Sequence, residues 1–458
     1  MKLVKSLLLG SAAGFAAVAG AQAADLPSRK AAPVEYVRVC SAYGAGFFYI
    51  PGTETCLRVG GRVRAEYTVG TRYGDSQDAY GTRARGRLNV DARTATAYGT
   101  LRTFFRYELT NSSNFYNGTV NGNQGIIAPG TARVSQTSTA SLLDLAFVQF
   151  GPITAGRAQS FFDFYANDFG FSTIRTADSR LNLLAYTATF GSGFSATLSL
   201  EDRTTGTGGR ENGVVNFGGS AGSAVLGQDF PDVVASLRVD QGWGSAQLSG
   251  AISQRSTSNT GLLFSNTTEE TAWAIQGGVK INLPMLAAGD HLFLQAAYAD
   301  GALGYLGYGG QMGVGRITSS ALGLAVADIS VDGFGNAKTA EGWSFVAGLR
   351  HFWTPQLRTE IYGSYSELKL GYTLANQAVA GVVSRPLDPK ELIIAGNLIW
   401  TPVSGLDIGV EVVYSRVELK QAVLAANNAG LRPALAAGGR LVKSDDAIAG
   451  RFRIQRDF

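Results

Sequence analysis

Segments of about ten residues in which apolar and polar side chains alternate recur from residue 57 to the end of the chain. In the segment 57–69, LRVGGRVRAEYTV, the side chains of Val63, Tyr67 and Val69 share one face, while arginine, glutamate and threonine occupy the other. A period of two residues is the repeat of a β-strand, so each segment is predicted to be a strand with one apolar face. The chain is therefore expected to be all-β.

The spacing of these segments is more informative than any one of them. Their connections alternate between short turns, such as Gly151-Pro152, and long segments, such as 111–139 and 301–340. Sixteen strands are predicted, at residues 57–69, 82–93, 99–110, 140–150, 153–159, 181–190, 194–203, 232–240, 244–253, 271–282, 290–300, 341–352, 356–366, 390–401, 405–416 and 446–458. This pattern is typical of a transmembrane antiparallel β-barrel with short periplasmic turns and long external loops.

A soluble β-sandwich also shows alternation, so the composition of the two faces has to separate the two architectures. The apolar face carries almost no charge, and aromatic residues such as Tyr67, Trp343 and Trp400 lie near strand ends on it, as in the interfacial girdle of a membrane barrel. The other face is too charged for a sandwich core. We therefore predict a barrel over residues 57–458. Its last strand must pair with its first, because an open edge in lipid leaves backbone groups unsatisfied. On this last strand, Arg451 and Arg453 are expected to face water.

The first residues indicate export. Lys2 and Lys5 precede an apolar run from Leu7 to Val18, and small residues follow at the end of residues 1–23, which are interpreted as a signal peptide. A retained membrane anchor is the alternative. The net charge of +4 is too small for this length to indicate nucleic-acid binding.

The chain has two cysteines, Cys40 and Cys56, in the segment 24–56, which is predicted to be an N-terminal periplasmic segment. In an exported protein these cysteines are expected to form a disulfide. Two thiolates without a nearby histidine make only half of a ligand set, so we expect neither a metal nor a cofactor.

The segment 37–61, VRVCSAYGAGFFYIPGTETCLRVGG, resembles the porins of α-proteobacteria. That family carries a Cys-x-Ala-Tyr-Gly-x-Gly-Phe run, then IPGT, then a second cysteine, and all three occur here between Cys40 and Cys56. The segment 145–165 is similar to the strand pair that leads into the family's third loop. The terminal Phe458 resembles the signal read by the barrel-assembly machinery. The long external loops match poorly.

The resemblance implies a trimeric, water-filled channel in the outer membrane of a Gram-negative bacterium, for passive diffusion of small hydrophilic solutes and ions. Independently, about sixteen strands is the size at which a barrel interior becomes an aqueous channel. The expected partners are therefore outer-membrane lipid, further copies of the chain, solutes and ions, and the assembly machinery.

Arginines gather on the polar face of the first three predicted strands. They are Arg58, Arg62, Arg64, Arg83, Arg85, Arg87, Arg102 and Arg106. Like charges on neighbouring strands destabilise a sheet unless they are screened or neutralised. A pore wall supplies water, anions and carboxylates, so these arginines are predicted to form its basic wall. The alternative is the solvated surface of a soluble sheet.

By resemblance, the segment 160–180 is the third loop, which folds into the barrel and narrows it. We therefore predict a constriction with arginines on the wall and acids on the loop, whose field orients dipolar solutes. The loop acids are Asp163, Asp168 and Asp178. Arg175 and Arg180 offset part of their charge. Ion preference, and general versus substrate-specific transport, stay open.

Aromatic residues of this loop could form a track that stacks sugars, but we favour a role in wedging the loop against the wall. Catalysis is not expected. The two histidines, His291 and His351, lie near predicted turns, and no serine has a nucleophile-elbow pattern. A barrel whose long loops bind an external partner is a third class. The segment 417–430 has some helical character and is expected near the barrel mouth.

Overall fold

The computed structural model describes eleven stretches of the chain. They are residues 38–71, 79–113, 137–203, 214–216, 224–260, 265–309, 311–312, 324–331, 337–370, 388–424 and 441–458. The predicted signal peptide, residues 1–23, and residues 24–37 of the predicted periplasmic segment lie outside them. The chain divides into two compact units, Met1–Cys56 and Leu57–Phe458.

The described part of the first unit is held by its disulfide. Cys40 and Cys56 are bonded, with their Cα atoms 5.9 Å apart, as predicted. Both are buried with Phe47 in a small apolar cluster. This part contains the 3₁₀-helix η1 (Ser41–Tyr43) and the strand β1 (Phe48–Tyr49). Closing a loop of this length contributes about 3 kcal/mol to stability.

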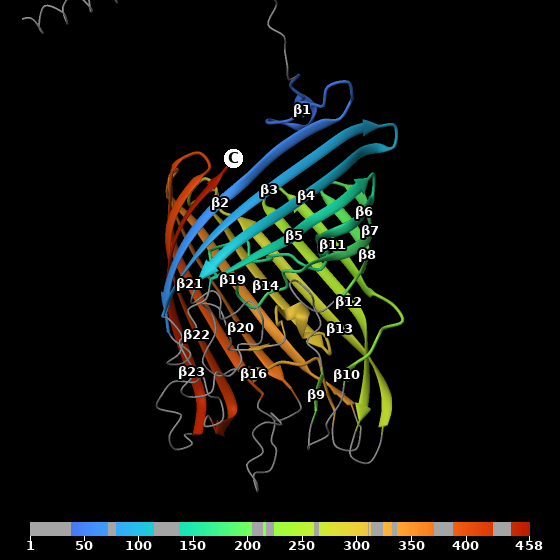
Figure 1. Ribbon diagram of the computed structural model, residues 1–458, viewed down its shortest axis with the longest axis vertical. Coiled ribbons are helices and arrows are strands. Elements are labelled where there is room, and N and C mark those ends of the chain that lie inside the picture. Colours follow the sequence, from blue (N-terminus) through green and yellow to red (C-terminus); the bar gives the residue numbers. More distant parts are fainter. Residues whose placement is uncertain are drawn as a thin grey trace, which may run out of the picture. The chain divides into compact units, whose positions relative to one another are not determined.

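The second unit is a closed barrel of sixteen antiparallel strands, as predicted (Figure 1). The strands are β2 (Cys56–Gly70), β3 (Tyr80–Thr96), β4 (Gly99–Ser113), β5 (Thr137–Phe150), β6 (Ile153–Gln159), β7 (Arg180–Gly191), β8 (Phe194–Glu201), β11 (Asp232–Gln241), β12 (Gly244–Thr260), β13 (Ser265–Asn282), β14 (His291–Asp300), β19 (Glu341–Thr354), β20 (Leu357–Lys369), β21 (Lys390–Val403), β22 (Leu406–Leu424) and β23 (Leu441–Asp457). Each pairs with the next barrel strand in the sequence.

Short strands and one helical turn lie in the long connections. They are β9 (Val214–Asn216), β10 (Ala224–Val225), η3 (Leu303–Leu306), β15 (Gln311–Met312), β16 (Leu324–Ala325), β17 (Ile329–Val331) and β18 (Ala337–Thr339). Several barrel strands are longer than predicted, because their ends beyond the apolar band lose the apolar alternation while the backbone pairing continues. The predicted helical character of residues 417–430 is wrong for its described part, since β22 runs to Leu424.

The barrel closes between β23 and β2, in a register from Arg62–Asp457 to Gly70–Ala449. Next to this strand pairing, the Gly61 amide donates to the Phe458 carbonyl at 2.9 Å, and the Phe458 amide donates to the Gly61 carbonyl at 3.1 Å. A Cβ on Gly61 would lie 2.4 Å from the Arg87 carbonyl oxygen and 2.7 Å from the Phe458 ring. Glycine is therefore required at position 61, where Phe458 pairs with β2.

The outer face of the barrel is apolar. Val63, Tyr67 and Val69 of β2 are each more than half exposed, whereas Glu66 and Thr68 between them are buried. The ring pairs Trp273–Tyr298 and Trp343–Tyr365 have centroids 5.2 and 5.5 Å apart, near the long-connection ends of β14, β19 and β20, as expected for an interfacial girdle. No helix in the described stretches is long and apolar enough to cross a bilayer.

Candidate functional site

The chain between β6 and β7 folds into the barrel. This constriction loop, residues 160–179, donates three backbone amides to glutamates of the inner wall. The bonds run from Phe161 to Glu201 at 3.1 Å, from Gly170 to Glu360 at 2.8 Å and from Phe171 to Glu411 at 2.6 Å. All three glutamates are almost fully buried. Hydrogen bonds to ionised acceptors are stronger than neutral ones, so the loop is firmly held.

Three glutamines of consecutive strands fix the first half of the constriction loop. Gln247 of β12 donates to the Phe161 carbonyl at 3.1 Å, and Gln276 of β13 donates to the Phe162 carbonyl at 2.8 Å. Gln295 of β14 accepts from the Tyr165 amide at 3.0 Å. The loop therefore lies along the inner face of β12, β13 and β14.

The aromatic side chains of the loop mostly face this wall. Phe162, Tyr165 and Phe169 are at most 1% exposed. The Tyr165 and Phe169 rings lie 5.2 and 5.4 Å from the ring of Phe293 on β14. Burial raises the pKa of the Tyr165 hydroxyl well above its usual value. These three rings wedge the loop and leave no face on which a sugar could stack.

A second segment, which the sequence analysis did not predict, also fills the barrel. This inner segment, residues 301–308 after β14, includes Leu303, Tyr305 and Leu306, each fully buried. The Tyr305 ring lies 4.5 Å from that of Phe162 in the constriction loop. Its hydroxyl donates to Asp232 of β11 at 2.8 Å. The two segments thus pack on each other inside the barrel.

Arg175 joins the two segments to the wall. Its guanidinium forms an ion pair with Glu391 of β21 and donates to the Gly307 carbonyl at 3.1 Å. It also lies over the Tyr308 ring, 4.3 Å from the centroid. Burial alone would lower the pKa of Arg175, but the Glu391 carboxylate outweighs it and raises the pKa above the usual value. Arg175 is thus a structural anchor and not a free pore charge.

Six of the predicted wall arginines line the opposite inner face, where they form an arginine ladder. Its members are Arg64, Arg83, Arg85, Arg87, Arg102 and Arg106. Arg62 lies nearer the start of β2, where it donates to Asp457 at the C-terminal end of β23 at 2.5 Å. Arg58 precedes the first residue of β2 that pairs with β23, and it is exposed. The structure thus brings six of the eight predicted wall arginines together, and the other two lie near the short-turn end of the barrel.

Carboxylates on the wall itself accept from the ladder. Arg83 donates to Glu66 at 2.5 Å, and Arg87 donates to Glu108 at 2.6 Å. The remaining contacts run from Arg102 to Asp91 at 2.9 Å and from Arg106 to Asp144 at 3.4 Å. The sequence analysis named loop acids as the partners and missed Asp91, Glu108 and Asp144. The register between strands, which brings these groups side by side, was the missing information.

The three predicted loop acids have different environments. Asp163 is buried and accepts from the Ser179 amide at 2.7 Å, so it closes the base of the loop. Asp178 pairs with Arg180, which also contacts the wall carboxylate Asp144, both at 3.2 Å. Asp168 is exposed and forms no ion pair within the described stretches. Loop and ladder thus meet through alternating charges at Asp178, Arg180 and Asp144.

The two arginines of β23 that were expected to face water are in fact buried. Arg451 and Arg453 are 8% and 7% exposed. Both contact Glu66, and Arg453 lies over the ring of Phe171, 3.8 Å from its centroid. The expectation was wrong because the constriction loop covers the inner face of the closing strand.

The described part of the barrel therefore has an open half and a filled half. In the filled half, inward residues such as Ala274, Val346 and Ser366 are at most 2% exposed beneath the two segments. In the open half, the side chains of Arg85 and Arg102 are 26% and 27% exposed. A hollow of about 280 Å³ marks the boundary, lined by Asp144, Arg157, Asn167, Arg175, Asp178, Arg180 and Tyr308 among others.

Sequence comparison places these features among known proteins. The sequence profile of the porin subfamily matches residues 25–436. The porin Omp2b of Brucella neotomae is 35% identical over 315 residues, which cover 67% of this chain and 76% of that protein. The porin Omp2b of Brucella melitensis matches with the same identity and coverage.

Structure comparison finds a similar fold in the outer membrane channel DcaP of Acinetobacter baumannii. The TM-score is 0.59, over 90% of this chain and 99% of that chain. The sequences are only 16% identical, so this likeness concerns the fold.

Proposed function

Since the chain belongs to the porin subfamily, we propose that it conducts small hydrophilic solutes and ions through the open half of its barrel, between the arginine ladder and the two inward-folded segments. It is an outer-membrane porin, and its family is one of channel proteins. The proposal rests on a difference in side-chain burial between the two halves of the barrel interior. Side chains of the ladder are partly exposed, whereas the inner face of β12–β14 and β19–β21 is covered.

The charge of the open half favours anions. The ladder shares its carboxylates with Arg93, Arg180, Arg451 and Arg453, which makes ten guanidinium groups. The carboxylates are Glu66, Asp91, Glu108, Asp144 and Asp178, the last of which pairs with Arg180. Ten arginines against five carboxylates leave an excess of five positive charges. A positive lining raises the local concentration of anions and disfavours cations.

The remaining expectations are part of the proposal. The family implies a homotrimer, and the aromatic end at Phe458 suits recognition by the barrel-assembly machinery. The disulfide-bonded residues before the barrel are assigned to the periplasm. Catalysis is not proposed, because both histidines have structural contacts. His291 bonds to the Gly289 carbonyl at 2.9 Å, and His351 to Asp290 at 2.6 Å.

The test is a planar-bilayer recording in potassium chloride, followed by reversal potentials in a salt gradient. Discrete current steps establish the pore, and steps in threes support the trimer. We predict an anion-selective reversal potential, shifted towards cation selectivity in the variant R85Q/R87Q/R102Q because three of the excess charges are lost.

The matched control is K369Q/K390Q/K420Q, which removes the same number of charges from exposed lysines near the long-connection ends of β20, β21 and β22, outside the ladder. We expect this control to keep the wild-type selectivity. A ladder variant with unchanged selectivity would contradict the role of the arginines, and a folded barrel without current steps would contradict the channel.

A further inference from the structure

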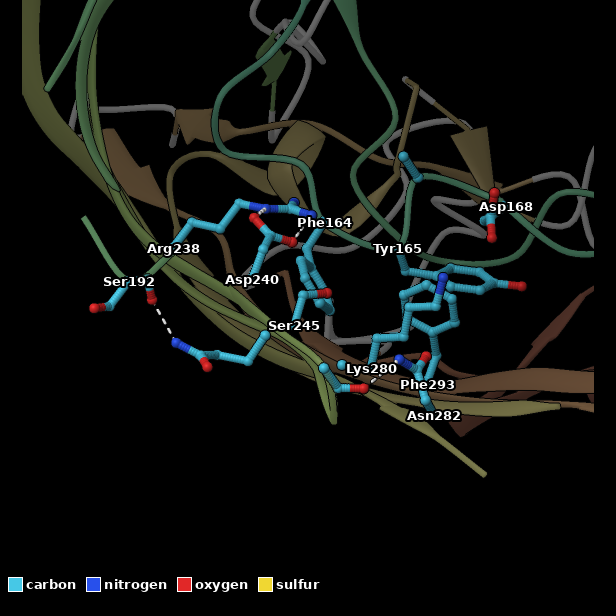
Figure 2. A pocket seen from close by; sticks show the side chains of 14 residues that line it. Phe164, Tyr165, Asp168, Ser192, Arg238, Asp240, Ser245, Lys280, Asn282 and Phe293 are labelled. Carbon is cyan, nitrogen blue, oxygen red and sulfur yellow. Dashed lines mark hydrogen bonds and ion pairs between the residues drawn. The ribbon is translucent and has the colours of Figure 1, made fainter. Parts of the chain in front are cut away.

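A hollow of about 910 Å³ lies at the short-turn mouth of the barrel, between the constriction loop and strands β11 to β14 (Figure 2). Its floor follows one row of side chains across four strands, because the register pairs Asp240 with Ser245, Ser245 with Lys280, and Lys280 with Phe293. Phe164 of the constriction loop covers the row. The volume lies in the range of ordinary ligand sites, about 300–1,000 Å³.

The two cations of the hollow differ in how they are neutralised. Arg238 donates to both carboxylate oxygens of Asp240, at 2.7 and 2.9 Å, so this pair is internally satisfied. Lys280 forms no ion pair within the described stretches and lies over the Phe293 ring, 5.4 Å from the centroid. Figure 2 shows Phe164 between the Arg238–Asp240 pair and Lys280. Lys280 is therefore the group available to an incoming anion.

Aromatic rings supply the apolar part of the hollow. The rings of Phe164 and Phe293 are 5.7 Å apart in an edge-to-face arrangement. Phe164 is partly exposed towards the hollow, whereas Phe293 is buried beneath Lys280. A flat apolar ring can stack on or against Phe164 while its acid group reaches Lys280.

The remaining charge limits what can bind. Asp168 of the constriction loop lines the same hollow, is exposed, and has no ion-pair partner in the described stretches. A second negative charge on a solute would meet this carboxylate, and like charges in one site repel each other. The hollow thus suits one acid group per solute.

Resting on the porin function proposed above, we propose that this hollow is a binding subsite for small aromatic monocarboxylates, held by Lys280 and Phe164 and selected against dianions by Asp168. Solutes of this class would pause at the short-turn end of the channel. The channel is then partly substrate-selective and not only a diffusion pore.

The experiment titrates potassium benzoate against the potassium chloride current of single channels. Benzoate should reduce the current at lower concentration than acetate, which lacks the ring, or phthalate, which carries two acid groups. In K280Q the apparent affinity for benzoate should fall about fivefold, the effect of losing roughly one solvated ion pair. K390Q, the same substitution at an exposed lysine outside the hollow, should titrate like the wild type. In D168N, the concentration of phthalate that reduces the current should approach the concentration of benzoate that does so.

Equal benzoate titrations for K280Q and the wild type would overturn the subsite while leaving the channel intact. If phthalate bound the wild type with the same affinity as benzoate, the proposed role of Asp168 would be overturned. A protein that gives no current at all would defeat the proposed function instead. Equilibrium dialysis of benzoate against the detergent-solubilised protein then makes the same comparison of K280Q, K390Q and wild type without a current.

Discussion

Each buried carboxylate of the wall holds several arginines in place. Glu66, 1% exposed, accepts from Arg83 of β3 and from Arg451 and Arg453 of β23. Because these arginines lie side by side on the wall, the shared carboxylate stabilises guanidinium groups that would otherwise repel one another. At the scale of residues, the basic wall is thus a network and not a row of independent charges.

Removing this shared carboxylate should destabilise the barrel. We expect E66Q to lower the unfolding free energy by about 3–5 kcal/mol, because arginines that remain buried lose their counter-ion. Heat or urea unfolding, followed by the gel mobility of the folded barrel, measures the change. E418Q is the matched control, since Glu418 is half-exposed and contacts Arg416 only at 3.9 Å. E418Q should lower the unfolding free energy by less than about 1 kcal/mol. Equal losses in the two variants would show that Glu66 is not a central partner.

Sequence reasoning at this scale identified the arginines better than their partners. The alternation places Arg83, Arg85 and Arg87 on one face by itself, because strand periodicity is local. Which carboxylate faces which arginine depends on the pairing register between strands. Asp144 is also the extra residue of β5 at a bulge in its pairing with β4, which no local pattern reveals.

Two segments of irregular chain set the bore of the channel. The constriction loop is anchored by hydrogen bonds to charged wall residues, whereas the inner segment is anchored chiefly by apolar burial of Leu303, Tyr305 and Leu306. A barrel of sixteen strands would otherwise leave a wide lumen. At the scale of elements, the inner segment is the part most readily released by substitution.

The variant L303S/L306S should therefore conduct better than the wild type. Each substitution removes a fully buried apolar side chain, at a cost of about 2–5 kcal/mol for comparable truncations, which is enough to detach a short segment. Single-channel conductance in potassium chloride checks the prediction. L286S, at a leucine 62% exposed between β13 and β14, is the control and should leave conductance unchanged. Unaltered conductance in a folded L303S/L306S barrel would show that the inner segment does not narrow the pore.

The strands were predictable from the sequence and the inner segment was not. All sixteen strands follow from period-two alternation, because one face of each meets lipid where the strand crosses the apolar band. The constriction loop was found through its resemblance to a family. The inner segment has neither signal. Its glycines and apolar residues suit an external loop equally well, and only its contacts with β11 and the constriction loop, Asp232 and Phe162 among them, draw it inside.

The whole barrel is a closed cylinder in which the lumen is divided lengthwise. Closure was predicted from the alternating last strand, and the register of β23 on β2 confirms it. The division was not predicted, because it results from packing of two segments against the inner wall opposite the ladder. Transport through the open half alone is the central claim about the whole molecule.

Thiol modification of two matched variants tests this claim most directly. Thr110 of β4 faces the open half beside Arg85, and Ser344 of β19 is 1% exposed beneath the filling segments. Both cysteines of the chain are already bonded to each other, so a cysteine introduced at either position is the single free thiol. A bulky, charged methanethiosulfonate is added while single channels of T110C and S344C are recorded. The account predicts a permanent fall in conductance for T110C and none for S344C. An equal fall in both, or a fall in S344C alone, would contradict it.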